Sequence, residues 1–152
     1  FVDQLCKKEN AQVLDAWIKS GDRGFYEISY SCRYGGGRSK TRKYFHSFFN
    51  PDFFLKITKG AYRYYLVVEI KEDKDDSEEN KAKNRYARQH FEELNHRLEA
   101  AGEKERYLFH FLSPNGYTAF FDQLRSGTIL EGPDTFKCEL ELLLEEAGEQ
   151  EF

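Results

Sequence analysis

Two short polar segments stand out because their residue types suit metal-assisted hydrolysis. Asp52 follows Asn50 and Pro51 at the start of an expected strand, and Glu69 and Lys71 lie two residues apart in the next one. Side chains two residues apart on a strand point to the same face. If these strands are neighbours in a sheet, Asp52, Glu69 and Lys71 meet in one place.

Two adjacent carboxylates repel each other, and this repulsion raises the pKa of one of them. A divalent cation removes the conflict, and carboxylate oxygens suit Mg²⁺, with Mn²⁺ as a substitute. The backbone carbonyl of Ile70 is a further candidate ligand beside Asp52 and Glu69. A bound metal lowers the pKa of water and stabilises charge at phosphorus. Lys71 is then placed to orient the attacking water or to neutralise developing charge.

A purely structural explanation of the same residues stays open. Pro-Asp pairs are common at turns, and a Glu-x-Lys pair also suits an exposed strand face. However, Glu69 and Lys71 interrupt an otherwise apolar strand, where an unpaired charge is costly. An inward-facing charged pair needs a partner, and a metal ion shared with Asp52 supplies one.

The surrounding sequence predicts an α/β fold with a central mixed β-sheet flanked by helices. We expect helices where apolar residues recur at helical spacing, in residues 1–18, 80–101 and 113–124. We expect strands in β-branched and aromatic segments, at residues 25–30, 40–49, 52–58, 63–71 and 106–112. Residues 136–144 alternate in polarity and favour a strand over a helix. Hairpin-linked strands followed by a strand–helix–strand crossover predict the mixed sheet.

Composition and length favour one globular domain over residues 1–152. The chain is 39% hydrophobic and 16% aromatic, and no apolar run approaches the roughly 20 residues of a membrane helix. It contains no Met and opens on Phe1, so we expect a fragment of a longer polypeptide. Cys6, Cys32 and Cys138 form no CxxC pair, which argues against zinc and favours thiols in a reducing cytoplasm.

Motifs of several other enzyme classes are absent from the sequence. It has no phosphate-binding GxxxxGK[ST] loop, no GxGxxG, no HExxH and no GxSxG. The net charge of -4 argues against non-specific coating of nucleic acid. A local contact is still predicted, because five basic residues without an acid occur at Arg33, Arg38, Lys40, Arg42 and Lys43. A solvated basic hairpin is the alternative.

These motifs resemble the PD-(D/E)xK nuclease superfamily, most closely the C-terminal endonuclease domain of type III restriction enzymes. The resemblance covers roughly residues 1–112 and rests on an ordered series: Trp17-Ile18-Lys19, Phe25, Ile28, Asn50-Pro51-Asp52-Phe53, Val68-Glu69-Ile70-Lys71, Lys83 and His90-Phe91. It implies a restriction-endonuclease-like core and a Mg²⁺-dependent DNA endonuclease. In that family, a helicase-like translocase precedes the nuclease domain.

The resemblance also implies roles for individual residues and partners. Asp52 and Glu69 match the metal ligands, and Lys71 matches the catalytic lysine. Lys83 matches a helix lysine that we expect near the DNA backbone, with a solvated lysine as the equal alternative. The implied partners are double-stranded DNA, the helicase portion of the same parent chain, and a methyltransferase or specificity subunit.

One departure from the family pattern concerns a further glutamate on the first helix. In the type III pattern it precedes a phenylalanine that aligns with Phe1, so it falls upstream of the sequence given. Glu9 is the nearby candidate, but its spacing fits poorly. We therefore expect slow or no cleavage by this fragment alone. A catalytically inactive nuclease-fold module that binds DNA or a partner subunit stays open, as does a nuclease that acts on RNA.

Overall fold

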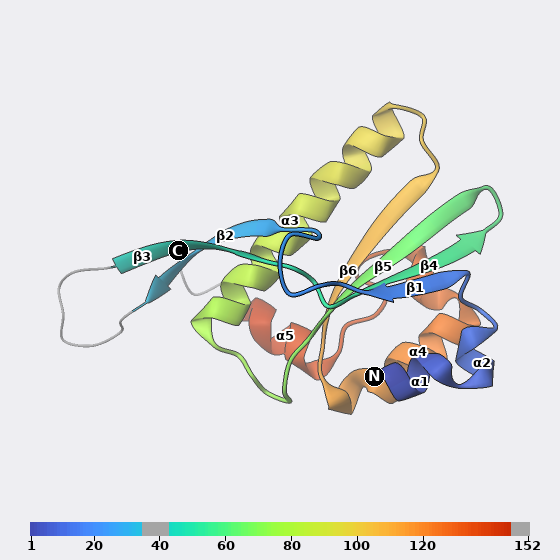
Figure 1. Cartoon of the computed structure of the whole chain (residues 1–152), viewed down its shortest axis with the longest axis horizontal. Helices are drawn as coiled ribbons and strands as arrows, with labels where there is room; N and C mark the ends of the chain where they lie inside the picture. Colours follow the sequence, from blue (N-terminus) through green and yellow to red (C-terminus); the bar gives the residue numbers. More distant parts are fainter. Residues whose placement is uncertain (35–42, 147–152) are drawn as a thin grey trace.

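The computed structural model describes residues 1–34 and 43–146 and combines a four-stranded sheet with a two-stranded ribbon and helices (Figure 1). The strands are β1 (Ala16–Lys19), β2 (Ile28–Tyr34), β3 (Lys43–Phe49), β4 (Phe53–Lys59), β5 (Tyr62–Ile70) and β6 (Glu105–Leu112). The α-helices are α1 (Val2–Cys6), α2 (Lys8–Ala11), α3 (Glu78–Ala100), α4 (Tyr117–Ser126) and α5 (Glu139–Glu146), and short 3₁₀ helices cover Pro114–Gly116 and Thr128–Glu131.

The sheet has the strand order β1-β4-β5-β6. β4 pairs antiparallel with β1 and β5, whereas β6 runs parallel to β5 after the long crossover through α3. β5 lies between two strands, and its apolar segment Leu66–Val68 is fully buried, as an internal strand requires. The predicted mixed sheet flanked by helices is therefore confirmed.

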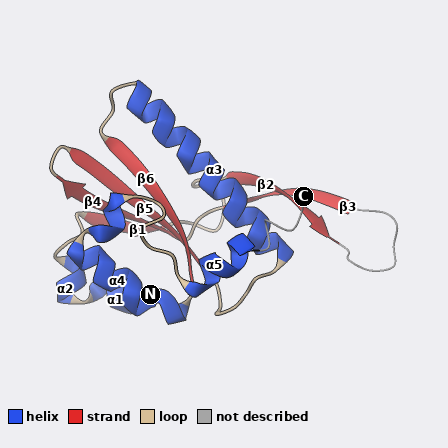
Figure 2. Ribbon diagram, turned by 180° about the vertical axis from the view of Figure 1, so that it is seen from behind, coloured by secondary structure: helices blue, strands red, loops and turns tan. Residues whose placement is uncertain are grey.

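Helices cover both faces of the sheet (Figure 2). Aromatic side chains fill the layers between the helices and the sheet. On one face Phe91 of α3 stacks on Tyr107 of β6, with 5.9 Å between ring centroids, and Tyr107 stacks on Tyr65 of β5 at 4.8 Å. On the opposite face Phe1 lies 4.8 Å from Phe53 of β4 and contacts the rings of α4. The high aromatic content thus forms two apolar layers around one sheet.

The outer edge of β6 is covered by side chains rather than by another strand. The Asn95 amide accepts a hydrogen bond from Tyr107 N (2.8 Å) and donates one to Tyr107 O (2.7 Å). Four residues along, Glu141 accepts from Phe111 N (3.1 Å), and the Cys138 thiol donates to Phe111 O. These contacts satisfy edge groups that would otherwise be open to another chain.

The two-stranded ribbon formed by β2 and β3 projects away from the four-stranded sheet (Figures 1 and 2). Its inner face packs on α3 and buries apolar side chains that include Ile28, Tyr30 and Phe49. The two strands were predicted as 25–30 and 40–49, and both are present with shifted bounds. The predicted glycine turn at residues 35–37 lies outside the described residues.

Two predictions of secondary structure are wrong. Residues 1–18 are not one helix, because Ala16–Lys19 pair with β4 and place the Trp17 ring 6.2 Å from that of Phe53. The C-terminal segment predicted as a strand instead contains α5. Leu140 and Leu144, four residues apart, are buried, whereas Leu142 is 49% exposed. This is helical spacing, which the apparent alternation in the sequence concealed.

Candidate active site

The structure brings the carboxyl groups of Asp52 and Glu69 together at one end of the sheet. The antiparallel β4–β5 register pairs Phe53 with Val68. The residue before Phe53, Asp52, therefore lies opposite the residue after Val68, Glu69. The two carboxyl groups share a hydrogen bond. They lie on the sheet face that α3 covers, because side chains alternate along β5 and Tyr65 contacts this layer.

Local backbone contacts fix the position of Asp52. Ser20, directly after β1, donates its N–H to the Asp52 carbonyl at 2.9 Å and its hydroxyl to the Pro51 carbonyl. The Asp52 side chain accepts a hydrogen bond from Ile70 N at 2.8 Å through Oδ2. One carboxylate oxygen is therefore held by the end of β5, while the role predicted for the Ile70 carbonyl stays a prediction.

Glu69 is a buried acid with an unusual environment, since only 4% of the residue is exposed. Burial, followed by the hydrogen bond and the charge of Asp52, raises the pKa of Glu69 to about 9. The ammonium groups of Lys71 and Lys83 oppose this increase but do not outweigh it. At neutral pH the favoured state of the pair thus retains a proton, and a cation could replace that proton.

Two lysines complete this end of the sheet. Lys71 follows β5 directly, and its backbone N–H donates to the Leu112 carbonyl at 3.0 Å. Lys83 lies in the second turn of α3, with only 13% of its side chain exposed. Both ammonium groups act on Glu69. The pKa of Glu79 is lowered first by a hydrogen bond from Tyr30 and then by the same two ammonium groups. The predicted lysines Lys71 and Lys83 are therefore both near the carboxylate pair.

Lys83 contacts Glu79 and Tyr30, two residues that were not predicted from the sequence to belong to the site. Its Nζ lies 3.6 Å from Glu79 Oε1, and 5.5 and 5.6 Å from the ring centroids of Tyr30 and Phe49. The Tyr30 hydroxyl donates to the same Glu79 oxygen at 2.6 Å. Burial and this hydrogen bond raise the pKa of Tyr30 to about 12. The i,i+4 spacing of Glu79 and Lys83 was the readable signal for their pairing.

Glu9 is not brought to the carboxylate pair. It lies exposed on α2, and α2 packs on α4, which covers the opposite face of the sheet from Glu69. The N-terminal residue that does lie near this end is Phe1, whose ring contacts that of Phe53, the residue after Asp52. The structure therefore gives no support to Glu9 as a ligand.

The predicted basic segment is described in part. Arg33 is exposed on β2, with its guanidinium carbon 5.2 Å from the centroid of the Tyr44 ring on β3. Lys43 begins β3. The remaining three predicted contact residues, Arg38, Lys40 and Arg42, lie outside the described residues.

The donor set at the Asp52–Glu69 pair fits a hard cation. Carboxylate oxygens are the ligands that Mg²⁺ prefers, and their mutual repulsion decreases when a cation binds. Within residues 1–34 and 43–146, no group of three or more His, Cys, Asp or Glu side chains is arranged to hold a metal ion. A metal at this site would therefore depend on two acidic side chains, with backbone oxygens or water as its other ligands.

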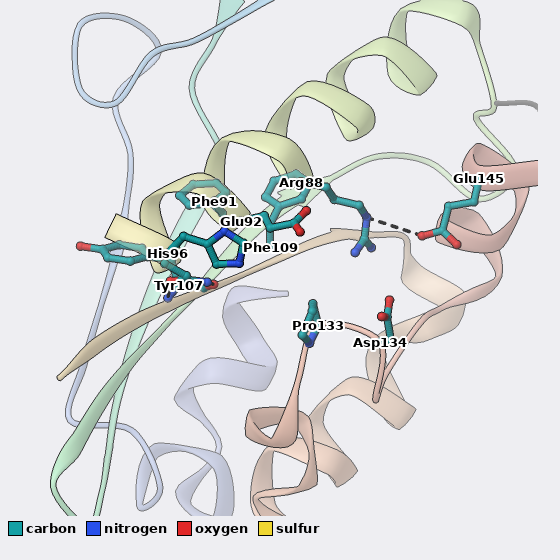
Figure 3. A pocket seen from close by; sticks show the side chains of 10 residues that line it. Arg88, Phe91, Glu92, His96, Tyr107, Phe109, Pro133, Asp134 and Glu145 are labelled. Atoms are coloured by element: carbon teal, nitrogen blue, oxygen red, sulfur yellow. Dashed lines mark hydrogen bonds and ion pairs between the residues drawn. The ribbon is translucent and has the colours of Figure 1, made fainter. Parts of the chain in front are cut away.

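A pocket of about 390 Å³ lies away from this pair, between α3, β6 and the segment leading to α5 (Figure 3). Its polar wall includes Arg88, which faces Glu145 at 3.6 Å. Arg88 also donates to the buried Glu141, which accepts from His110 Nδ1 if that nitrogen carries the proton. The sequence pattern predicted a strand over Glu141, so this buried cluster could not be predicted from it.

Comparisons with protein-family models, with curated proteins and with solved structures found no match to this chain. In the described part of the chain, no helix is both long and apolar enough to cross a membrane. The geometry of the site itself is therefore the basis on which a function can be proposed.

Proposed function

We propose that this chain is a Mg²⁺-dependent endonuclease domain that hydrolyses phosphodiester bonds in double-stranded DNA. It would serve a restriction or DNA-defence system together with the helicase portion of a larger parent chain. One observation carries the proposal: the carboxyl group of Asp52, directly before β4, meets that of the buried Glu69 on β5, beside two lysines. Buried acids with a strongly raised pKa, such as Glu69, are enriched at functional sites.

The arrangement of elements supports a restriction-endonuclease-like core. Asp52 directly precedes β4 and Glu69 lies on its antiparallel neighbour β5, which leads through a long helix into a parallel strand. The Phe1 ring lies against Phe53, so the start of α1 is close to Asp52. In the family pattern, the residue aligned with Phe1 follows the first-helix glutamate, which makes this proximity compatible with the resemblance.

Each residue has a distinct part in the proposed reaction. Asp52 and Glu69 would hold the metal, with the Ile70 carbonyl as a further ligand. A bound metal ion supplies a more acidic water and neutralises charge on the phosphate. Lys71 would orient the water or stabilise the developing charge, and Lys83 would bind a phosphate oxygen next to the site. The rigid strands keep these groups in position.

A second candidate function is a nuclease-fold module that binds DNA or a partner subunit without cutting. The observation in its favour is the metal-ligand set, which has only two acidic side chains in the part of the chain that the structure describes. Cleavage and metal binding must therefore be measured separately.

The deciding experiment is nicking of supercoiled plasmid with Mg²⁺ or Mn²⁺ by this chain and by Asp52→Asn, Glu69→Gln and Lys71→Ala. We expect slow nicking that each substitution reduces by about 10²-fold or more. The control is Glu99→Gln, an exposed acid near the distal end of α3, which should cut like wild type.

Full activity of Lys71→Ala would remove its catalytic assignment. If the wild-type chain binds Mn²⁺ but does not cut, the binding module is the better description. If Asp52→Asn does not change Mn²⁺ binding, the metal site itself is wrong.

A further inference from the structure

The outward face of the β2–β3 ribbon carries aromatic side chains that are largely exposed to solvent. Residues directly opposite each other on this face are Ser29 and Phe48, Ser31 and His46, and Arg33 and Tyr44. Phe48 is 63% exposed and Tyr44 is 54% exposed, whereas the neighbouring Phe49 points inward and is 6% exposed. One face of the ribbon is thus a core surface, and the other presents rings to the solvent.

The exposed rings form a row along β3. Tyr44, His46 and Phe48 occupy every second position, so successive rings are about 7 Å apart along the strand. That spacing is about twice the 3.4 Å rise per base in one strand of a duplex. The row therefore suits a nucleic acid strand whose bases are unstacked from each other and can stack on protein rings.

The charge of the ribbon matches such a ligand. The sequence from residue 28 to residue 49 holds five of the 23 Lys and Arg residues and none of the 27 Asp and Glu residues. An acidic chain that concentrates positive charge in one segment creates a local attraction for phosphates. Two of these five basic residues, Arg33 and Lys43, lie on the described strands of the ribbon.

Arg33 connects this charge to the aromatic row, because its guanidinium lies over the Tyr44 ring. A second such pair stands close by on α3, where Arg85 lies 5.7 Å from the centroid of the Tyr86 ring. All four residues line one hollow of about 170 Å³, together with Ser31 and one acidic residue, Glu78. Guanidinium groups beside exposed rings can bind phosphate while a base stacks on the ring.

We propose that the outward face of the ribbon, formed by Arg33, Tyr44, His46 and Phe48, binds single-stranded nucleic acid by base stacking. This goes beyond the proposed function, because stacking requires neither metal nor cleavage. The inner face of the same ribbon contacts Lys83 through Tyr30 and Phe49. Unpaired nucleotides on the ribbon would consequently lie on the element that borders the carboxylate pair.

The test is fluorescence anisotropy with a labelled oligothymidine and with a blunt duplex of equal length, both in EDTA at low salt. Tyr44→Ala and Phe48→Ala should each weaken oligothymidine binding by about 5-fold to 100-fold, the range of one lost stacking contact. Tyr44→Phe and Phe48→Tyr keep the ring and should bind like wild type. Leu142→Ala, which removes an exposed apolar side chain from α5, is the matched control.

Two results would overturn the proposal: no binding of oligothymidine by the wild type, or equal binding of oligothymidine by the wild type and the alanine variants. Self-association that Phe48→Ala abolishes, without any binding of oligothymidine, would assign the face to a protein partner instead. Asp52→Asn should bind oligothymidine normally. The stacking surface and the nuclease proposal can therefore fail independently.

Discussion

Glu69 and Glu141 are both buried carboxylates, yet their surroundings differ in kind. Glu141 is fully buried and accepts hydrogen bonds from Arg88 (2.8 Å), Phe111 N (3.1 Å) and Cys138 N (2.9 Å), with His110 Nδ1 at 3.0 Å. Glu69 has another carboxyl group as its hydrogen-bond partner, and its pKa is raised to about 9. Hydrogen-bond donors of the protein therefore neutralise the charge of Glu141, whereas Glu69 faces a second acid.

The difference separates a structural acid from a functional one. A carboxylate whose oxygens are already bonded to the protein has little to gain from a ligand, and its removal exposes buried donors. A carboxylate pressed against a second one is stabilised by an added cation. Burial alone would not distinguish the two, since both residues are less than 5% exposed.

The largest expected effect comes from breaking the structural acid. Glu141→Leu leaves the Arg88 guanidinium and two backbone N–H groups without their acceptor, and it should lower the free energy of unfolding by about 3 to 5 kcal/mol. Urea denaturation followed by circular dichroism measures the change. Leu142→Ala, at the exposed neighbouring position, is the control. A loss below about 1 kcal/mol would contradict the structural role of the cluster.

The functional acid should show the opposite sign. The folded-state pKa of Glu69 lies above its ordinary value of 4.5, so the unfolded chain releases this proton first as the pH rises. Wild-type stability should therefore fall between about pH 4.5 and pH 9 through this group. Glu69→Gln should stabilise the metal-free protein at pH 8 by about 2 to 4 kcal/mol and have little effect at pH 5.

Denaturation of Glu69→Gln and of Glu99→Gln at both pH values, with EDTA present, measures this difference. Destabilisation of Glu69→Gln at pH 8 would show that the carboxylate is compensated by the protein, as Glu141 is. The comparison between the two acids would then fail.

Metal addition should sharpen the contrast further. With Mn²⁺ at about 100 times its dissociation constant, the wild type should gain up to about 3 kcal/mol at pH 8. Asp52→Asn should gain much less, because one of the two carboxylate ligands is gone. Thermal unfolding with Mn²⁺ and with EDTA reports the gain, and Glu141→Gln should retain it. Equal gains in wild type and Asp52→Asn would place the ion elsewhere.

The smallest expected effect on stability comes from the Tyr30 hydroxyl, which bonds the Glu79 carboxylate that pairs with Lys83. Tyr30→Phe removes the hydroxyl that donates to Glu79 but keeps the ring beside the ammonium group, so it should cost about 0.5 to 1.5 kcal/mol. If the endonuclease assignment holds, nicking should also decrease modestly. A Tyr30→Phe variant with wild-type stability and activity would show that Glu79 holds Lys83 unaided.

The sequence predicted the elements whose periodicity is strong and missed those that depend on tertiary partners. The apolar run of β5 and the long pattern of α3 sufficed to predict both. β1 has four residues and exists because it pairs with β4, which no local pattern shows. The helical spacing of Leu140 and Leu144 was hidden by an alternating run of apolar residues.

The candidate site shows the same division. Asp52, Glu69 and Lys71 could be predicted because a charged side chain in an apolar strand is costly to bury unless it has a partner. Tyr30 and Glu79 were not, because their contact joins residues 49 positions apart across the ribbon and α3. His110 and Glu141, 31 positions apart, were missed for the same physical reason. Sequence motifs reveal functional residues that lie in short segments. Contacts between residues far apart in the sequence become visible only in the folded structure.

The hydrogen bonds that Asn95, Cys138 and Glu141 make along β6 have a consequence for how this protein behaves at high concentration. They occupy N–H and C=O groups with which a second molecule would begin intermolecular strand pairing. The opposite border of the sheet, β1, is only four residues long. A strand of a second molecule could therefore pair with only four residues at the β1 edge of this sheet, and the β6 edge is obstructed. Loss of Glu141 would free the Phe111 N–H at the β6 edge for such pairing.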